Sequence, residues 1–209
     1  MKFLKMEVLI DKGHFSKSQI WKTLQKHIHE SIQAVVWPPG SDKFTIYPQS
    51  GKKRGEGNGV KPIKNSFMAK LTEYGWQLEV KMDIATVKQP GKVDAVYLIE
   101  SGALFPEDRY FATEWETGNI SSSHRAVNKM AIGLLDKKLA GGILVLPTRK
   151  MYNYLTDRVG NFRELTPYFP MWKALNLDEG FLAIIAVEHD AESWDVPRIK
   201  KGTNGRHLV

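Results

Sequence analysis

GILVLP at residues 142 to 147 and FLAIIAV at residues 181 to 187 are two runs without a polar side chain. A continuous apolar run of this length is typical of a strand that is buried on both faces of a sheet. Segments with a helical pattern alternate with strand-like segments around both runs. The sequence therefore predicts an α/β domain, with a central mixed β-sheet flanked by helices.

The first expected helix begins at Ser16, because Ser16 and Gln19 form the signature of a capping box. The helix is expected to stop before Pro38 and Pro39. Its apolar residues recur at a spacing of four, which places them on one face: Ile20, Leu24, Ile28 and Ile32. This pattern predicts a helix packed on the sheet through one stripe.

Further elements are expected along the rest of the chain. The expected helices cover residues 66 to 83, the stretch from Asn119 or Ser121 to about Lys137, and residues 149 to 159. The expected strands cover residues 43 to 47, 92 to 99 and 109 to 117. Gly141 and Gly142 are expected to end the helix that reaches about Lys137.

Length and composition narrow the class of protein. A chain of 209 residues is expected to form one domain over residues 1 to 209, with a sizeable core. Its 42% hydrophobic and 25% charged residues are ordinary for a globular protein and exclude a disordered chain. No run of about 18 apolar residues is present, so no segment is expected to span a membrane.

The first thirteen residues, MKFLKMEVLIDKG, contain an apolar stretch too short and too interrupted by charge for a signal peptide. The chain has no cysteine, which excludes disulfides and thiolate metal sites. A cytoplasmic location is therefore expected. Thirty Lys and Arg against 23 Asp and Glu give a net charge of +7, which favours nucleic acid or an anionic membrane surface as partner.

GKKRGEGNGVKPIK, residues 51 to 64, combines four glycines with five Lys or Arg residues. It lacks the Gly-Lys-Ser/Thr ending of a phosphate-cradling nucleotide loop, which excludes a site for a nucleoside triphosphate. Two interpretations remain. The segment is either a mobile surface loop or a loop that becomes ordered against a phosphate backbone.

Glu114 and Glu116 flank one tryptophan in ATEWETGNISSSHR, residues 112 to 125. Residues two apart in a strand share a face, so both carboxylates are expected on the same side as Tyr110 and Ala112. Two adjacent carboxylates repel unless a cation lies beside them, and Mg²⁺ prefers such oxygen ligands. The alternative is a solvated strand face whose charges have no function.

Asp94 lies inside the strand-like segment KVDAVYLI, where aspartate is disfavoured. An Asp on one strand and a Glu-x-Glu on the next is the pattern of a metal-dependent phosphodiesterase, in which the metal stabilises charge on the phosphate oxygens. Asp94 and Glu114 would hold the metal, and Glu116 would position or deprotonate the attacking water. Glu79 would complete a second metal position. The alternatives are a strand-edge role for Asp94 and a solvated helical position for Glu79.

With these residues, the chain resembles the BamHI-type restriction endonucleases, which are type II enzymes of the PD-(D/E)xK nuclease class. The likeness rests mainly on EWETGNISSSHRAVNK, residues 114 to 129, and YLTDRVGNFRELTPYF, residues 154 to 169. Shorter stretches support it in the same order along the chain, namely AVVWPPGSDKFTI, GVKPIK, GWQLEVKMDI, KVDAVY and KGTNG. Two long and chemically unusual segments in the right order are more specific than a single motif.

The resemblance implies a restriction-endonuclease-like fold and a symmetric homodimer that cleaves double-stranded DNA at the palindrome GGATCC. The cut follows the first G of each strand and requires Mg²⁺. By this likeness Glu79, Asp94, Glu114 and Glu116 form the catalytic set, and the first three hold the metal. Glu116 stands where the wider class has lysine, which favours a general-base role. The helices beginning near Ser121 and Arg149 would supply the dimer contacts.

The resemblance also implies which residues contact DNA. Arg158 can bridge guanine O6 and N7 while Asp157 accepts from cytosine N4, although adjacent opposite charges also form local salt bridges. Asn119 suits adenine, Arg125 suits another guanine, and Ser121 can contact more than one type of base. The alternative role of Asn119 and Ser121 is that of helix-cap residues. Lys64 would contact a phosphate directly or through water. Asn204, in KGTNG, would lie at a further DNA contact.

Four features depart from the family pattern. The loop at residues 51 to 57 is slightly longer and more basic, Asn204 stands at an aspartate position, and Arg206 replaces an apolar residue. The family pattern also continues into a longer C-terminal tail, and a shorter tail is compatible with relaxed specificity for the DNA sequence. Two other functions share some of these residues: a metal-dependent phosphoesterase with a different nucleic-acid substrate, and a DNA-binding module without catalysis.

Overall fold

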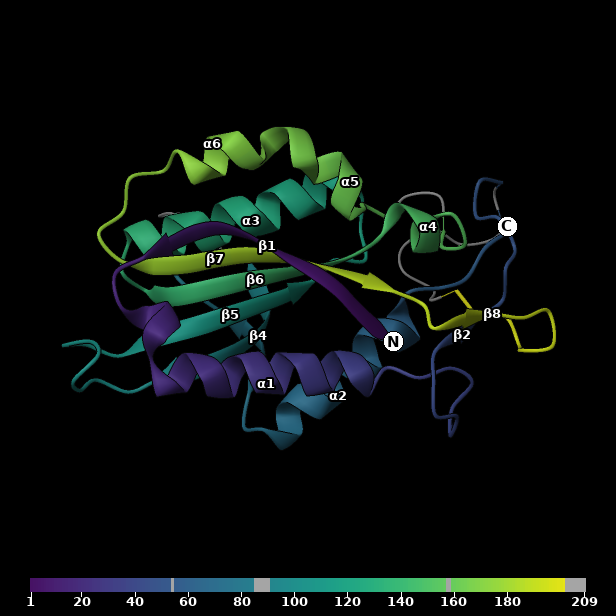
Figure 1. The fold of residues 1–209 in the computed structure, drawn as a ribbon, viewed down its shortest axis with the longest axis horizontal. Coiled ribbons are helices and arrows are strands. Elements are labelled where there is room, and N and C mark those ends of the chain that lie inside the picture. The colour runs from purple at the N-terminus through teal and green to yellow at the C-terminus, as the bar shows by residue number, and fades with distance from the viewer. Residues whose placement is uncertain (54, 85–90, 157–158, 202–209) are drawn as a thin grey trace.

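A six-stranded sheet lies at the centre of the computed structural model, with helices covering both of its faces (Figure 1). The structure describes residues 1–53, 55–84, 91–156 and 159–201. The strands of the sheet are β1 (Lys2–Lys12), β3 (Gln77–Lys81), β4 (Lys92–Ile99), β5 (Arg109–Trp115), β6 (Leu139–Pro147) and β7 (Gly180–Glu188).

The strand order is β1-β7-β6-β5-β4-β3. The central strands β5, β6 and β7 are mutually parallel, whereas β1, β4 and β3 join by antiparallel pairing. The expected mixed sheet is thus confirmed. Every residue of β6 and of β7 is buried, as the two apolar runs predicted, because helices cover the sheet on both sides.

Each face of the sheet carries its own apolar core. On one face, α1 (Gln19–Gln33) and α2 (Lys61–Glu73) pack through residues such as Leu24, Ile28 and Phe67. On the other face, α3 (Ile120–Leu135), α5 (Phe162–Leu165) and α6 (Phe169–Lys173) pack through residues such as Met130 and Leu165. Figure 1 shows the two helical layers on opposite sides of the strands.

Near the N-terminus, two details differ from the expected elements. Residues Phe15–Lys17 form a 3₁₀ turn, and α1 begins at Gln19, with Ser18 as its cap. The Ser18 hydroxyl accepts a hydrogen bond from the Trp21 backbone N–H at 3.1 Å, so the expected cap at Ser16 was wrong by two residues. The N-terminal residues, which the sequence assigned to no element, form the edge strand β1.

The helix expected over residues 66 to 83 is wrong in its second half. Helix α2 starts earlier, with Pro62 in its first turn, and ends at Glu73. Gly75 then adopts a φ of +82°, a left-handed conformation that favours glycine and turns the chain into β3. Glu79 therefore lies on a strand and not on a helix.

Two further boundaries were also wrong. Gly141 and Gly142 lie inside β6 and do not end a helix; α3 ends at Leu135. A side chain at Gly142 would come within 2.6 Å of the Met130 sulfur, so close packing of α3 on the strand explains this glycine. Of the helix expected over residues 149 to 159, α4 covers Arg149–Tyr152, and residues 153 to 156 are not helical.

A small parallel pair, β2 (Thr45–Ile46) with β8 (Ala191–Glu192), lies beside the main sheet. It confirms the short strand expected at residues 43 to 47. None of the helices in the described part of the chain combines the length and the apolar character that crossing a bilayer requires.

Candidate active site

Side chains along β5 alternate between the two cores as the sequence predicted. Phe111 and Trp115 pack in the core on the α1 and α2 side, whereas Tyr110 and Ala112 pack in the core on the α3 side. Glu114 has the same parity as Ala112 and is buried, with 8% of its surface exposed. The alternation of the strand thus places a carboxylate on the α3 side of the sheet.

Asp94 and Glu114 meet where β4 begins and β5 ends. The two strands are antiparallel neighbours, so the start of one lies beside the end of the other. The Asp94 backbone N–H donates to Glu114 Oε2 at 3.3 Å, and the Trp115 N–H donates to Asp94 Oδ2 at 2.9 Å. The structure therefore brings together two carboxylates that are twenty residues apart in the sequence.

A lysine from each helical layer pairs with one of these carboxylates. The Lys64 ammonium, on α2, lies 2.5 Å from Asp94 Oδ1. The Lys129 ammonium, on α3, lies 2.5 Å from Glu114 Oε1 and also donates to the Lys92 carbonyl at 2.7 Å. Sequence reasoning missed Lys129. Its position four residues after Arg125 on the same helix was the available signal, since such residues share a face.

Burial and the neighbouring Asp94 carboxylate raise the pKa of Glu114 to about 7, although Lys129 opposes the shift. Burial also raises the pKa of Glu116, and the Gly118 N–H opposes that shift. Both carboxyl groups are therefore better proton acceptors than an exposed glutamate. Such displaced pKa values in a cleft are typical of functional sites.

Glu116 lies just past the end of β5, at the turn into α3. Its Oε1 accepts a hydrogen bond of 2.5 Å from the Gly118 backbone N–H, which fixes the carboxylate on this turn. A side chain at Gly118 would approach the same oxygen to 2.8 Å. Glycine at this position therefore allows the carboxylate and the backbone to lie close together.

The carboxylates of Asp94, Glu114 and Glu116 line a cleft of about 900 Å³ between the end of the sheet and α3. Asn119 caps α3, and its side-chain oxygen accepts from the Ser122 N–H at 3.2 Å. Ser121 and Arg125, on the first turns of the helix, line the cleft beside the carboxylates. Three of the residues predicted for catalysis therefore share one cavity with two of the base-reading residues predicted on α3, Ser121 and Arg125.

Among the four predicted catalytic residues, Glu79 is the one that does not line this cleft. The pairing of Leu78 with Ala95 and of Val80 with Val93 places Glu79 opposite Asp94 in register. Its φ of +55° is unusual for a residue with a side chain, and its carboxylate pairs with Lys92 at 3.6 Å. Glu79 lines a second, adjoining pocket, which shares Lys64 and Thr117 with the cleft.

Three predicted DNA contacts, Asp157, Arg158 and Asn204, lie outside the described residues. In the described ranges, no group of three or more acidic, histidine or cysteine side chains is arranged to hold a metal ion. Asp94 and Glu114 are nevertheless adjacent oxygen donors at the wall of an open cleft. This donor set fits Mg²⁺, which takes one or two protein carboxylates and completes its shell with water and phosphate.

The comparison with known families decides the class of protein. The family model for restriction endonuclease BamHI matches residues 1–206. The chain belongs to the BamHI restriction endonuclease family. It is 48% identical over 208 residues to the type II restriction enzyme OkrAI of Oceanobacter kriegii, with all of both chains covered. It is 36% identical over 197 residues to the type II restriction enzyme BamHI of Bacillus amyloliquefaciens, covering 91% of this chain and 85% of that one.

The fold agrees with this family. A crystal structure of the restriction endonuclease BglII, complexed with a DNA 16-mer, matches with a TM-score of 0.61 and covers 90% of this chain and 79% of that chain. At 9% sequence identity this likeness shows the fold alone, which is the restriction-endonuclease-like α/β architecture. As a BamHI-family member, the protein is a type II restriction endonuclease, and its partner is double-stranded DNA.

Proposed function

We propose that the protein cleaves double-stranded DNA at GGATCC, after the first G of each strand, in a Mg²⁺-dependent reaction that leaves 5′ overhangs. The observation that carries the proposal is the contact between Asp94 and Glu114 in a cleft shared with the first turns of α3. Type II restriction enzymes generally depend on a divalent metal ion. The likeness to OkrAI and BamHI supports the same site and chemistry here.

Asp94 and Glu114 would hold the metal ion, and Glu79 would contribute from the neighbouring strand. When bound, Mg²⁺ stabilises charge on the phosphate oxygens and lowers the pKa of a bound water. Lys64 and Lys129 each pair with one of the two carboxylates and offset its negative charge. Lys64 would contact a DNA phosphate, because its ammonium also borders the adjoining pocket.

Glu116 would orient the attacking water and accept its proton. A general base acts best when its pKa approaches the working pH, and burial moves the pKa of Glu116 upward in that direction. The hydrogen bond from Gly118 to Oε1 fixes the side chain. The other oxygen of the carboxylate would then accept the proton.

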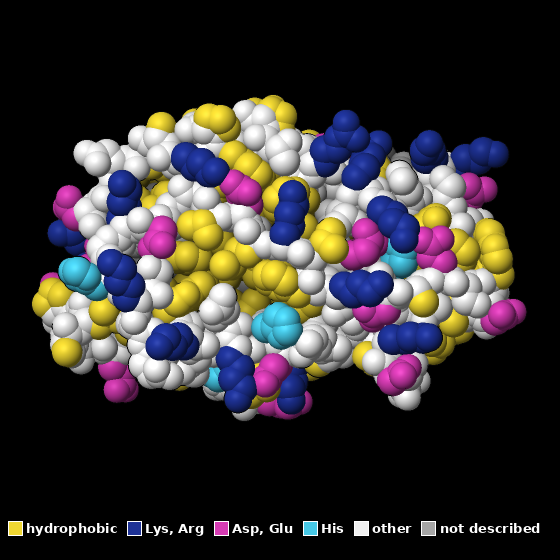
Figure 2. Space-filling view, viewed as in Figure 1, with side chains coloured by type: hydrophobic (Ala, Val, Ile, Leu, Met, Phe, Trp, Pro, Cys, Tyr) yellow, Lys and Arg dark blue, Asp and Glu magenta, His cyan; other side chains and the backbone are white. Residues whose placement is uncertain are grey.

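Base reading would come from two segments. Asn119, Ser121 and Arg125 lie at the beginning of α3, from which a helix reads base edges in the major groove. Asp157 and Arg158 would read one G·C pair, and Asn204 would add a further contact. Contacts between basic side chains and DNA phosphates would supply much of the binding affinity. Figure 2 shows Lys and Arg side chains gathered at one end of this face, over α4 and the segments beside it.

The protein would act as a symmetric homodimer, because a two-fold dimer matches a palindromic site. Helix α3 and the segment beginning at Arg149 would form the contact between subunits. Sedimentation of the protein alone should give the mass of two chains, and sedimentation with a GGATCC duplex should give the mass of two chains and one duplex. A monomer bound to one duplex would contradict the dimer.

Plasmid digestion tests the proposed function. A plasmid with one GGATCC site should be linearised with Mg²⁺ and remain intact in EDTA, and a plasmid without the site should survive. Glu114→Ala and Glu116→Gln should each reduce the rate at least about a hundredfold, as loss of a metal ligand or a general base does. Undiminished cutting by both variants would disprove the assignment of the active site.

A further inference from the structure

Asn58 is a completely buried side chain at the base of the glycine-rich loop. Its Nδ2 donates to the Tyr47 carbonyl at 2.7 Å and to the Tyr154 carbonyl at 2.8 Å, and its Oδ1 accepts from the Ile199 N–H at 3.1 Å. Its backbone N–H donates to Tyr154 at 2.7 Å, and its carbonyl accepts from Thr156 at 3.1 Å. One residue thus joins three segments that are far apart in the sequence.

The loop packs against these segments so closely that glycine is required. A side chain at Gly51 would lie 1.5 Å from the Leu155 carbonyl oxygen, and one at Gly59 would lie 2.2 Å from the Lys200 oxygen. The Gly51 N–H donates to Asn153 and the Gly59 N–H donates to Ile199, both at 2.9 Å. The base of the loop is therefore fixed, although Lys52 and Lys53 at its tip are exposed.

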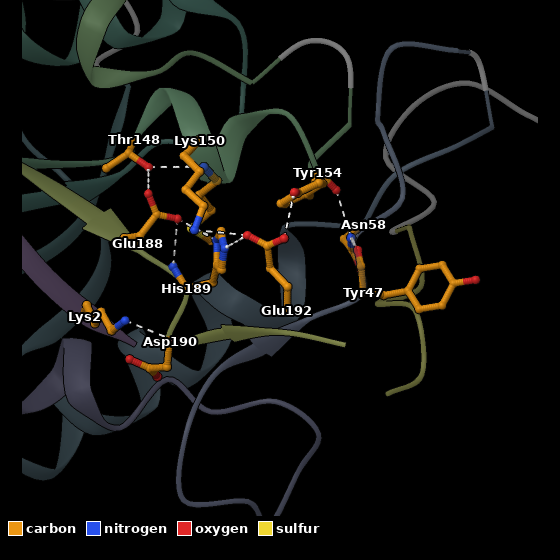
Figure 3. A network of polar contacts seen from close by, with 11 residues as sticks. Lys2, Tyr47, Asn58, Thr148, Lys150, Tyr154, Glu188, His189, Asp190 and Glu192 are labelled. Carbon is orange, nitrogen blue, oxygen red and sulfur yellow. Dashed lines mark hydrogen bonds and ion pairs between the residues drawn. The ribbon is translucent and has the colours of Figure 1, made fainter. Parts of the chain in front are cut away.

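The segment that Asn58 holds is anchored a second time through Tyr154 (Figure 3). The Tyr154 hydroxyl donates to Glu192 Oε2 at 2.8 Å. The other oxygen of Glu192 contacts His189 Nε2 at 2.9 Å and the Lys150 ammonium at 3.0 Å. Glu188 accepts a hydrogen bond from Thr148, and its Oε1 lies 2.5 Å from His189 Nδ1. Residues 153 to 156 are thus tied to the ends of β6 and β7.

The segments joined by Asn58 connect to the residues expected to read DNA bases and to the helix beside the catalytic carboxylates. Thr156 directly precedes Asp157 and Arg158 in the sequence. In the other direction, α2 begins three residues after Asn58 and carries Lys64, which pairs with Asp94. Thr156 and Lys64 line the same pocket beside the cleft. Asn58 therefore connects residues 154 to 156, which precede the expected base-reading pair in the sequence, with the helix that contacts the carboxylates.

We propose that Asn58 is a positioning residue for sequence discrimination, which fixes the segment at residues 153 to 156 relative to α2. The proposal rests on the proposed function. The buried amide can hold three segments because it offers two donors and one acceptor, and all are used. Loss of the donors would let the reading segment shift while the carboxylates keep their own contacts. Discrimination should then fall more than the cleavage rate.

Asn58→Asp is the sharpest variant. It keeps an oxygen for the Ile199 N–H but places a second oxygen against the carbonyls of Tyr47 and Tyr154, where no donor remains. Asn176→Asp is the matched control, because Asn176 is exposed in the loop after α6, at the other end of the sheet (Figure 1). The measurement is kcat/KM on GGATCC and on every duplex that differs by one base pair, well below the melting temperature of each variant.

Asn58→Asp should lower discrimination about tenfold or more at one G·C pair of each half-site. Discrimination at the other pairs, and in the control, should stay as in the wild type. A uniform loss at all positions would show a general structural role and overturn the proposal, as would unchanged discrimination. If the wild type itself does not prefer GGATCC, the proposed function fails first, and the two failures are thereby distinguished.

Tyr154→Phe keeps the proposal testable if Asn58→Asp does not fold. The variant removes only the hydroxyl that contacts Glu192, on a partly exposed ring, and should keep the melting temperature within a few degrees. It should weaken discrimination several-fold at the same G·C pair. An unfolded Asn58→Asp together with unchanged discrimination in Tyr154→Phe would overturn the proposal.

Discussion

The Lys129 ammonium lies 2.5 Å from Oε1 of Glu114 and thereby ties α3 to the end of β5. The lysine side chain is 20% exposed and the glutamate side chain 11% exposed, so water screens the pair only in part. Even so, burial and Asp94 keep the pKa of Glu114 near 7. The pair therefore reduces, but does not remove, the electrostatic cost of placing two carboxylates together.

Replacing Lys129 tests this relationship. Lys129→Met keeps the apolar stem but leaves the Glu114 carboxylate without its cation, which should raise the pKa of Glu114 further. At pH 8 without metal, the free energy of unfolding should fall by about 1–3 kcal/mol, the range for a buried polar group that loses its partner, because partial exposure of the pair offsets the larger cost of a charged group. At pH 5 the loss should shrink, because Glu114 is then protonated. Denaturant unfolding at both pH values measures the difference.

Lys138→Met is the matched control, since Lys138 is exposed on the turn between α3 and β6. It should change the free energy of unfolding by less than about 0.5 kcal/mol at either pH. Equal losses in both variants, or a loss in Lys129→Met that does not depend on pH, would contradict a role for the ion pair.

The raised pKa of Glu114 predicts how stability depends on pH. Because the folded-state pKa of about 7 lies above the ordinary value of 4.5, the folded protein binds more protons than the unfolded protein between these values. The contribution of Glu114 to stability should therefore fall as pH rises from 4.5 to 7. Glu114→Gln should remove this slope in the metal-free protein, whereas Glu107→Gln, on an exposed loop, should keep it. Parallel pH profiles for wild type and Glu114→Gln would refute the shift.

The same proton should compete with a metal ion. A carboxylate must lose its proton to ligate a cation, so the apparent affinity for Mg²⁺ should rise with pH up to about 7 and then level off. Below pH 7 the change should approach about tenfold per pH unit. Titration calorimetry with Mg²⁺ in the absence of DNA measures this directly. An affinity that is constant from pH 5.5 to 8 would argue against Glu114 as a ligand.

Glu79 should contribute to metal binding less than Glu114 does. Its side chain is 53% exposed and its carboxylate pairs loosely with Lys92, whereas Glu114 is buried beside Asp94. Glu79→Gln should therefore raise the Mg²⁺ concentration for half-maximal cleavage by about tenfold, the lower end for loss of a supporting group. Saturating Mg²⁺ should restore most of the rate. Glu73→Gln, on the exposed end of α2, serves as the control and should leave the titration unchanged.

The two lysines at the tip of the glycine-rich loop test its role in DNA binding. If Lys52 and Lys53 each contact a phosphate, Lys52→Ala/Lys53→Ala should reduce the slope of log affinity against log salt by about two. Affinity for GGATCC and for unrelated DNA should weaken equally. Lys137→Ala/Lys138→Ala removes the same charge from the turn after α3. Identical slopes for both double variants would mean that Lys52 and Lys53 make no phosphate contact.

The sequence predicted the elements whose physical signal is local. The two apolar runs became β6 and β7, and the alternation around Trp115 placed Glu114 on the α3 side. The segment before Pro38 became α1, but its cap moved from Ser16 to Ser18, because either serine suits the end of a helix. The second half of the helix expected at residues 66 to 83 became β3, since pairing with β4 outweighed local propensity.

The sequence alone determined the chemistry of this protein: which carboxylates are available, that no thiolate takes part, and that a helix follows Glu116 closely. Those properties belong to residue types and their spacing along one segment. The tertiary structure decided which distant groups meet. It paired Lys129 with Glu114, Lys64 with Asp94 and Asn58 with Tyr154, because contacts across strands and layers depend on sheet register and helix packing. No local pattern carries that information.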